Sequence, residues 1–73
     1  MKIQSPDIKP SRYQVIFTKL EEALQDAKEQ SQKLHTRLYI IFSHNLFFVD
    51  ADGDIHNMEI LYSIYENGKQ ITI

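Results

Sequence analysis

The chain has 73 residues, a formal net charge of −2 and a hydrophobic content of 42%, and its sequence contains no cysteine and no tryptophan. This length and composition predict one small globular domain and exclude a disordered tail. The lack of cysteine excludes disulfide-built scaffolds, thiol enzymes and cysteine-based zinc sites. A chain this short buries only about 60% of its unfolded surface, so its stability margin is small.

The first ten residues carry both prolines. Because proline removes a backbone donor and disfavours helix at the residue before it, residues 1–10 are predicted to form an extended tail ahead of a single domain at 11–73. No apolar stretch resembles a signal peptide or reaches the about 18–20 residues of a membrane helix. We therefore expect a cytoplasmic protein by default, with no membrane as partner.

The next segment predicts a strand followed by a helix. Residues 12–17 are rich in β-branched and aromatic side chains that alternate, which is typical of a strand. From Lys19 to Leu34 apolar side chains recur at helical spacing, which predicts an amphipathic helix. Thr18 and Glu21 fit a capping box at its start, although a helix beginning at Ser11 is an alternative. The apolar stripe comprises Leu20, Ala23, Leu24, Ala27, Ser31 and Leu34.

The rest of the chain contains three dipeptides that are typical of two-residue hairpin turns. His44-Asn45 separates two strand-like segments, Arg37–Ser43 and Leu46–Ala51. Asp52-Gly53 and Asn67-Gly68 are further dipeptides typical of hairpin turns. These signals predict an antiparallel meander after the helix. The fold class is therefore α+β, with one amphipathic helix on one face of a mainly antiparallel sheet and the element order β-α-β-β-β-β.

Residues 57–66 allow two interpretations. Their β-branched and aromatic content favours a strand. Alternatively, Asn57 caps a short helix that ends before Gly68.

Hairpin pairing sorts the strand side chains onto two faces, because directly opposed residues share a face. One face is almost wholly apolar and is predicted to pack against the helix; it comprises Leu38, Ile40, Phe42, Phe47, Val49, Met58, Ile60, Tyr62, Ile64, Ile71 and Ile73. The second face is predicted to be less covered and to form an interaction surface that includes Tyr39, Ile41, Phe48, Leu61 and Tyr65. Cover by strand twist and by the N-terminal tail is the alternative.

The last strand is a second candidate for association. It ends in Gln70, Ile71, Thr72 and Ile73, without a proline or an inward-pointing charge. Unprotected edges of this kind pair with another copy or with a partner's strand. We therefore predict a homodimer or a complex with another protein.

The acidic segment 50–54 suggests a metal site. Asp50, Asp52 and Asp54 match the first positions of an EF-hand calcium loop, but Ile55 and Leu61 stand where that loop needs Gly and Glu. Calcium binding is therefore an alternative function, and a hairpin turn flanked by acids is the simpler interpretation.

His56 and Glu59 have a metal-ligand spacing for a helix, but on a strand they point to opposite faces. No metal site and no cofactor are predicted.

Aromatic side chains on a sheet also stack nucleic-acid bases, so Tyr39, Phe48 and Tyr65 make single-stranded nucleic-acid binding a further alternative. Asp50 and Glu59 on the same face argue against it, because they repel phosphates. The sequence has no glycine-rich phosphate loop and too few residues for a large pocket, so no enzyme is predicted. The favoured function is a small protein-interaction module that self-associates.

Overall fold

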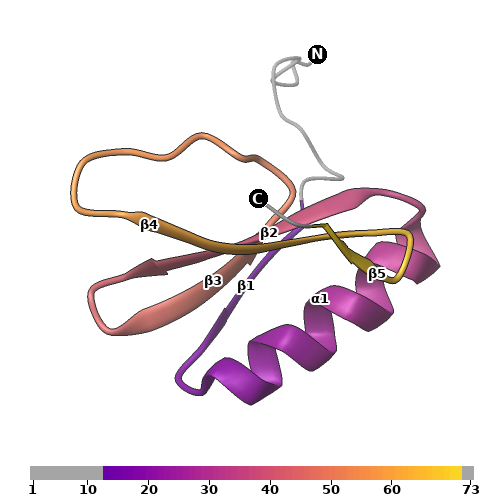
Figure 1. Cartoon of the computed structure of the whole chain (residues 1–73). Coiled ribbons are helices and arrows are strands. Elements are labelled where there is room, and N and C mark those ends of the chain that lie inside the picture. The colour runs from indigo at the N-terminus through magenta and orange to yellow at the C-terminus, as the bar shows by residue number, and fades with distance from the viewer. Residues whose placement is uncertain (1–12, 72–73) are drawn as a thin grey trace, which may run out of the picture.

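A computed structural model describes residues 13–71 of the chain (Figure 1). Five strands and one helix follow in the order β1 (Gln14–Phe17), α1 (Leu20–Leu34), β2 (Arg37–Ser43), β3 (Leu46–Asp50), β4 (Ile60–Glu66) and β5 (Lys69–Ile71). The helix packs on one face of an antiparallel sheet with the strand order β1-β3-β2-β4-β5. The predicted α+β class and the order of elements are confirmed. The predicted tail at 1–10 lies outside the described residues.

Helix α1 begins one residue later than predicted. Its N-cap is Lys19, which has an extended backbone and makes no side-chain capping hydrogen bond, so the predicted capping box of Thr18 and Glu21 is wrong. Ala23, Ala27 and Ser31 are buried, and these small side chains let the helix lie close to the sheet.

Two of the three predicted hairpin turns are present. His44 and Asn45 have φ values of 53° and 62°, and Asn67 and Gly68 have 55° and 83°. Two successive positive φ values are the mark of the turn that matches strand twist, and Asn and Gly tolerate them best. As predicted, Ile64 pairs with Ile71.

The third predicted hairpin, at Asp52-Gly53, is wrong. Strand β3 pairs with β1 on its free side, so β4 pairs with β2 instead of β3. The chain between them, residues 51–59, therefore forms no strand and crosses β2 as a long loop (Figure 1). The predicted meander is interrupted at this crossover.

Residues 57–66 contain a strand and not a short helix. β4 starts at Ile60, after a turn at residues 57–58. The register between β2 and β4 shifts, since Ile40 pairs with Ser63 but Ile41 pairs with Leu61. Tyr62 is the extra residue of this β-bulge.

Because of the bulge, the residues of β4 that follow it lie on the opposite sheet faces from those predicted. Beyond it the alternation is displaced by one residue, so Tyr65 lies opposite Leu38 and packs against the core. Ile64 lies opposite Tyr39 on the second face, together with its pair partner Ile71. A one-residue slip exchanges faces in any strand, and a bulge produces such a slip within the strand.

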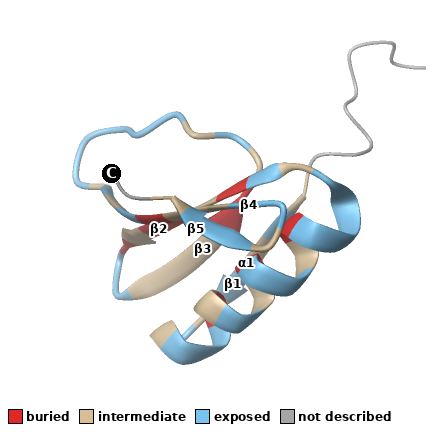
Figure 2. Ribbon diagram, turned by 45° about the vertical axis from the view of Figure 1, so that its right-hand side comes forward, coloured by how far each residue is buried: buried red, intermediate tan, exposed pale blue. Residues whose placement is uncertain are grey.

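The core lies between α1 and the sheet. Its fully buried members are Ala23, Ala27, Leu38, Ile40 and Val49 (Figure 2). Half-buried side chains packed against them are Tyr13, Phe17, Leu24, Phe47, Ala51 and Tyr65. The core contains few large buried side chains, and each contributes about 1.5–3 kcal/mol. Individual hydrogen bonds between elements therefore contribute measurably to the free energy of unfolding.

One such hydrogen bond joins α1 to the turn between β4 and β5. The buried Ser31 Oγ accepts the Gly68 N–H at 2.9 Å and donates to the Lys28 carbonyl at 3.1 Å. We expect Ser31→Ala to lower the free energy of unfolding by about 1–2 kcal/mol, because the Gly68 N–H loses its acceptor. Urea denaturation measures this, with the exposed Thr18→Ala as the control; an equal, small effect of both changes contradicts the assignment.

A second hydrogen bond joins the residue before β1 to the middle of α1. The Tyr13 hydroxyl donates to Asp26 Oδ2 at 2.5 Å. Burial, and then the hydrogen bond and the charge of Asp26, raise the pKa of Tyr13 above its ordinary value of 10.0.

This raised pKa makes stability pH-dependent. The unfolded chain loses the Tyr13 proton before the folded chain does, so the stabilisation is complete below pH 10 and is lost as pH rises toward the folded-state pKa. We expect the stability difference between wild type and Tyr13→Phe, about 1 kcal/mol at neutral pH, to shrink above about pH 10. Urea denaturation at several pH values tests this, and a constant difference contradicts it.

Candidate functional site

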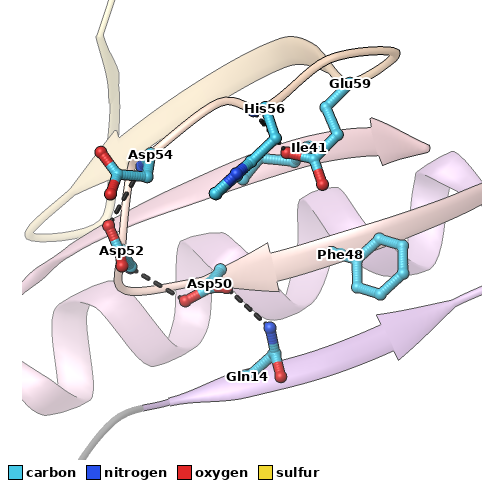
Figure 3. Close-up of a pocket in the computed structure, with 8 residues that line it drawn as sticks. All are labelled: Gln14, Ile41, Phe48, Asp50, Asp52, Asp54, His56 and Glu59. Carbon is cyan, nitrogen blue, oxygen red and sulfur yellow. Dashed lines mark hydrogen bonds between the residues drawn. The ribbon is translucent and has the colours of Figure 1, made fainter.

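A small pocket lies on the second face, opposite α1, between the sheet and residues 51–59, here called the acidic loop. It has a volume of about 150 Å³ (Figure 3). Its lining combines acidic, polar and apolar side chains from β1, β2, β3 and the loop: Gln14, Ile41, Phe48, Asp50, Asp52, Asp54, His56 and Glu59. The crossover of β2 thus creates a concave site with a partly polar lining.

The carboxylates of this pocket hold the backbone of the loop in place. Asp50, 5% exposed, accepts the Gln14 side-chain amide at 2.7 Å and the Asp52 N–H at 2.9 Å (Figure 3). Asp52 in turn accepts the Asp54 N–H at 3.0 Å. Successive turns of this kind are what short acidic side chains form with the backbone two residues on.

His56 and Glu59 are also joined within the loop. The His56 N–H donates to Glu59 Oε1 at 2.9 Å, and the Glu59 N–H donates to the His56 carbonyl at 3.1 Å. The carboxylate of Glu59 therefore closes a tight turn. Across residues 13–71, no three histidine or acidic side chains are grouped so that they could hold a metal ion. The carboxylates of Asp50, Asp52 and Asp54 are therefore not grouped in this way.

The residues of the predicted interaction surface do not form one open surface. Ile41 is 5% exposed, and with Phe48 it lines the pocket beneath the loop. The ring of Tyr39 lies against Gly53, and Leu61 is half-buried. Tyr65 lies on the opposite face, as described above. The crossing loop covers the part of the second face around Tyr39, Ile41 and Phe48.

The predicted edge strand is at the edge of the sheet. Within β5, Gln70 donates through Nε2 to Ser63 Oγ at 2.9 Å, and Ile71 is half-buried. Thr72 and Ile73 lie outside the described residues.

Four large apolar side chains in the acidic loop and the first residues of β4 are exposed. Ile55, Met58, Ile60 and Tyr62 are 40%, 89%, 58% and 50% exposed, and we call them the β4 patch. The Tyr62 ring contacts Phe47 edge-on, with centroids 5.8 Å apart. Hairpin pairing placed Met58, Ile60 and Tyr62 on the face under the helix, but all three are exposed.

Comparison with known proteins gives no relative for this chain: no protein-family model, no curated protein and no solved structure matches it. Within residues 13–71 no helix is both long and apolar enough to cross a bilayer. The fold and the site therefore define a small α+β domain with an acidic crossover loop and an exposed apolar patch.

The packing of the acidic loop on the sheet can be tested at Gly53. A Cβ atom there would lie 2.7 Å from Cζ of Tyr39, so Gly53→Ala forces the ring or the loop to move. We expect a loss of about 1–2 kcal/mol in the free energy of unfolding from this overpacking. Tyr39→Ala removes the clash, so Gly53→Ala should cost much less in that background. An equal cost in both backgrounds, measured by urea denaturation, contradicts this contact.

Proposed function

We propose that this chain is a small, non-enzymatic protein-interaction module that associates with a second copy of itself through the β4 patch. The observation that carries the proposal is the grouping of large exposed apolar side chains. Four of the six in the described residues fall between positions 55 and 62, and the other two, Ile16 and Leu34, lie on other elements. A concentration of exposed apolar side chains in one segment is typical of an interaction site, whereas single exposed apolar residues are ordinary.

The aromatic contacts behind the patch support it. Phe47 contacts Tyr62, and Phe42 lies against Phe47 with a centroid distance of 4.8 Å. These contacts hold the Tyr62 ring of the patch against Phe47. Preorganised aromatic surface loses little conformational entropy on association.

The polar pocket favours binding over catalysis. Its volume of about 150 Å³ is small beside ligand sites of about 300–1,000 Å³. The carboxylates of Asp50, Asp52 and Glu59 accept backbone hydrogen bonds of the loop itself. This is a structural use of acidic groups.

A second copy suits the physical properties of this chain. The core is small, and association adds burial that a short chain lacks.

Sedimentation equilibrium tests the proposal. Wild type should associate reversibly at about 0.1–1 mM, and Ile60→Lys should be monomeric there, because it places a charge in the β4 patch. Ile16→Lys is the matched control, since Ile16 is 52% exposed on β1, away from the patch, and it should associate like wild type. A monomeric wild type, or equal effects of both lysines, refutes the proposal.

A further inference from the structure

The turn between β4 and β5 contains the dipeptide Asn67-Gly68, which is chemically reactive as well as suited to a turn. Asparagine is thermolabile, because the main-chain nitrogen of the next residue attacks its side-chain amide. The chain has three asparagines, and all of them are exposed: Asn45, Asn57 and Asn67. Leu46 and Met58 follow the first two, whereas Gly68 follows Asn67. Since glycine has no side chain to hinder the attack, Asn67 is the most susceptible of the three.

The fold holds the attacking nitrogen in a hydrogen bond. The Gly68 N–H donates to Oγ of Ser31 at 2.9 Å, and Ser31 is fully buried in α1. The reactive species is the Gly68 nitrogen without its proton, and donation to Ser31 keeps that proton in place. The turn also fixes the direction of this nitrogen, since Asn67 and Gly68 have φ values of 55° and 83°. The attack therefore requires that this hydrogen bond opens.

Helix α1 also lies directly against the turn. A Cβ atom added to Gly68 would lie 3.0 Å from Oε1 and 3.2 Å from Cβ of Gln32. Rotation of the main chain at Gly68 is therefore restricted by the same helix that carries Ser31. Local opening of a segment costs less free energy than global unfolding and depends on the contacts of that segment. The contacts with Ser31 and Gln32 thus determine how often the turn opens.

From these observations we infer that Asn67 is a site of spontaneous deamidation, and that the hydrogen bond between Ser31 and Gly68 sets its rate in the folded protein. Hydroxide removes the proton of the Gly68 nitrogen, which then forms a bond to Cγ of Asn67. The bond from Cγ to the side-chain nitrogen breaks, and that nitrogen takes a proton from water and leaves as ammonia. The product is a cyclic succinimide, and the step involves no oxidation or reduction.

Water then opens the succinimide at one of its two carbonyl groups. Opening at Cγ gives aspartate at position 67, and opening at the main-chain carbonyl gives isoaspartate, whose main chain runs through Cγ. Isoaspartate thus adds a main-chain carbon between Glu66 and Lys69, which pair directly across the turn. Because turn length fixes the register of a hairpin, this product weakens the pairing of β4 with β5. Both products also add a negative charge beside Glu66.

The reaction is independent of the proposed self-association, because this turn and the β4 patch lie at opposite ends of β4.

Peptide mapping by mass spectrometry tests the inference. Wild type, Ser31→Ala and Tyr13→Phe are incubated in a mildly alkaline buffer, and the conversion of each asparagine is followed by its mass increase. Ser31→Ala removes the acceptor of the Gly68 N–H. Tyr13→Phe is the matched control, because it removes a different hydrogen bond to α1 and leaves the contacts of the β4–β5 turn unchanged. Wild type unfolded in urea gives the rate without protection.

Asn67 should convert before Asn45 and Asn57, and more slowly in folded wild type than in urea. Ser31→Ala should accelerate the conversion of Asn67 about 5–30-fold, as the loss of this hydrogen bond implies. Tyr13→Phe should stay within about twofold of wild type, because the turn opens locally. Equal rates in the two variants, or earlier conversion of another asparagine, overturn the inference.

Hydrogen exchange in wild type gives a second measurement that needs no variant. Exchange of the Gly68 N–H and deamidation of Asn67 require the same opening, so folding should slow both by the same factor, to within about tenfold. Exchange of Gly68 that is strongly protected while Asn67 converts at the rate found in urea contradicts control by this hydrogen bond.

Discussion

The pairing of β1 with β3 determines the rest of this structure. Once β1 occupies the outer side of β3, β4 has to join the sheet beside β2. The connecting chain must then cross β2, and it does so on the face that α1 leaves open. The burial of Ile41, the contact between Gly53 and Tyr39, and the polar pocket all follow from this crossing. Asp50 joins β1, β3 and the acidic loop. It is the last residue of β3, it accepts a hydrogen bond from Gln14 of β1, and it accepts the Asp52 N–H of the loop.

The crossing also explains why the apolar surface lies where it does. A short domain with one helix has two sheet faces to cover. The loop covers the second face with turns built on acidic side chains, so the apolar residues beneath it are shielded. The loop then has to rejoin the sheet at Ile60, and there it leaves Met58, Ile60 and Tyr62 exposed. The exposed apolar side chains therefore lie at and just before the start of β4, and not beneath the loop on the second face of the sheet.

Local signals in the sequence predicted much of this fold, and the errors involve contacts between distant segments. The helix and the turns at His44-Asn45 and Asn67-Gly68 depend on neighbouring residues, and all three are present. Asp52-Gly53 has the same local signal, but β1 competes for the edge of β3, and no local pattern reveals that competition. The bulge at Tyr62 likewise depends on the register with β2, so the exchange of Tyr65 and Ile64 between faces could not be predicted.

The prediction for the apolar residues around the start of β4 failed for a related reason. Hairpin pairing assigned Met58, Ile60 and Tyr62 to the face under the helix because it continued the sheet through a turn at Asp52-Gly53. Met58 instead lies in the acidic loop, and all three side chains are exposed. The positive φ of Met58 is equally invisible, since methionine carries no turn signal. Where local preference and structure disagree without a gain in packing, the disagreement indicates a requirement outside the single folded chain. At Met58 an exposed apolar side chain stands where Asn or Gly would fit the backbone better, and we propose that contact with a partner is the reason.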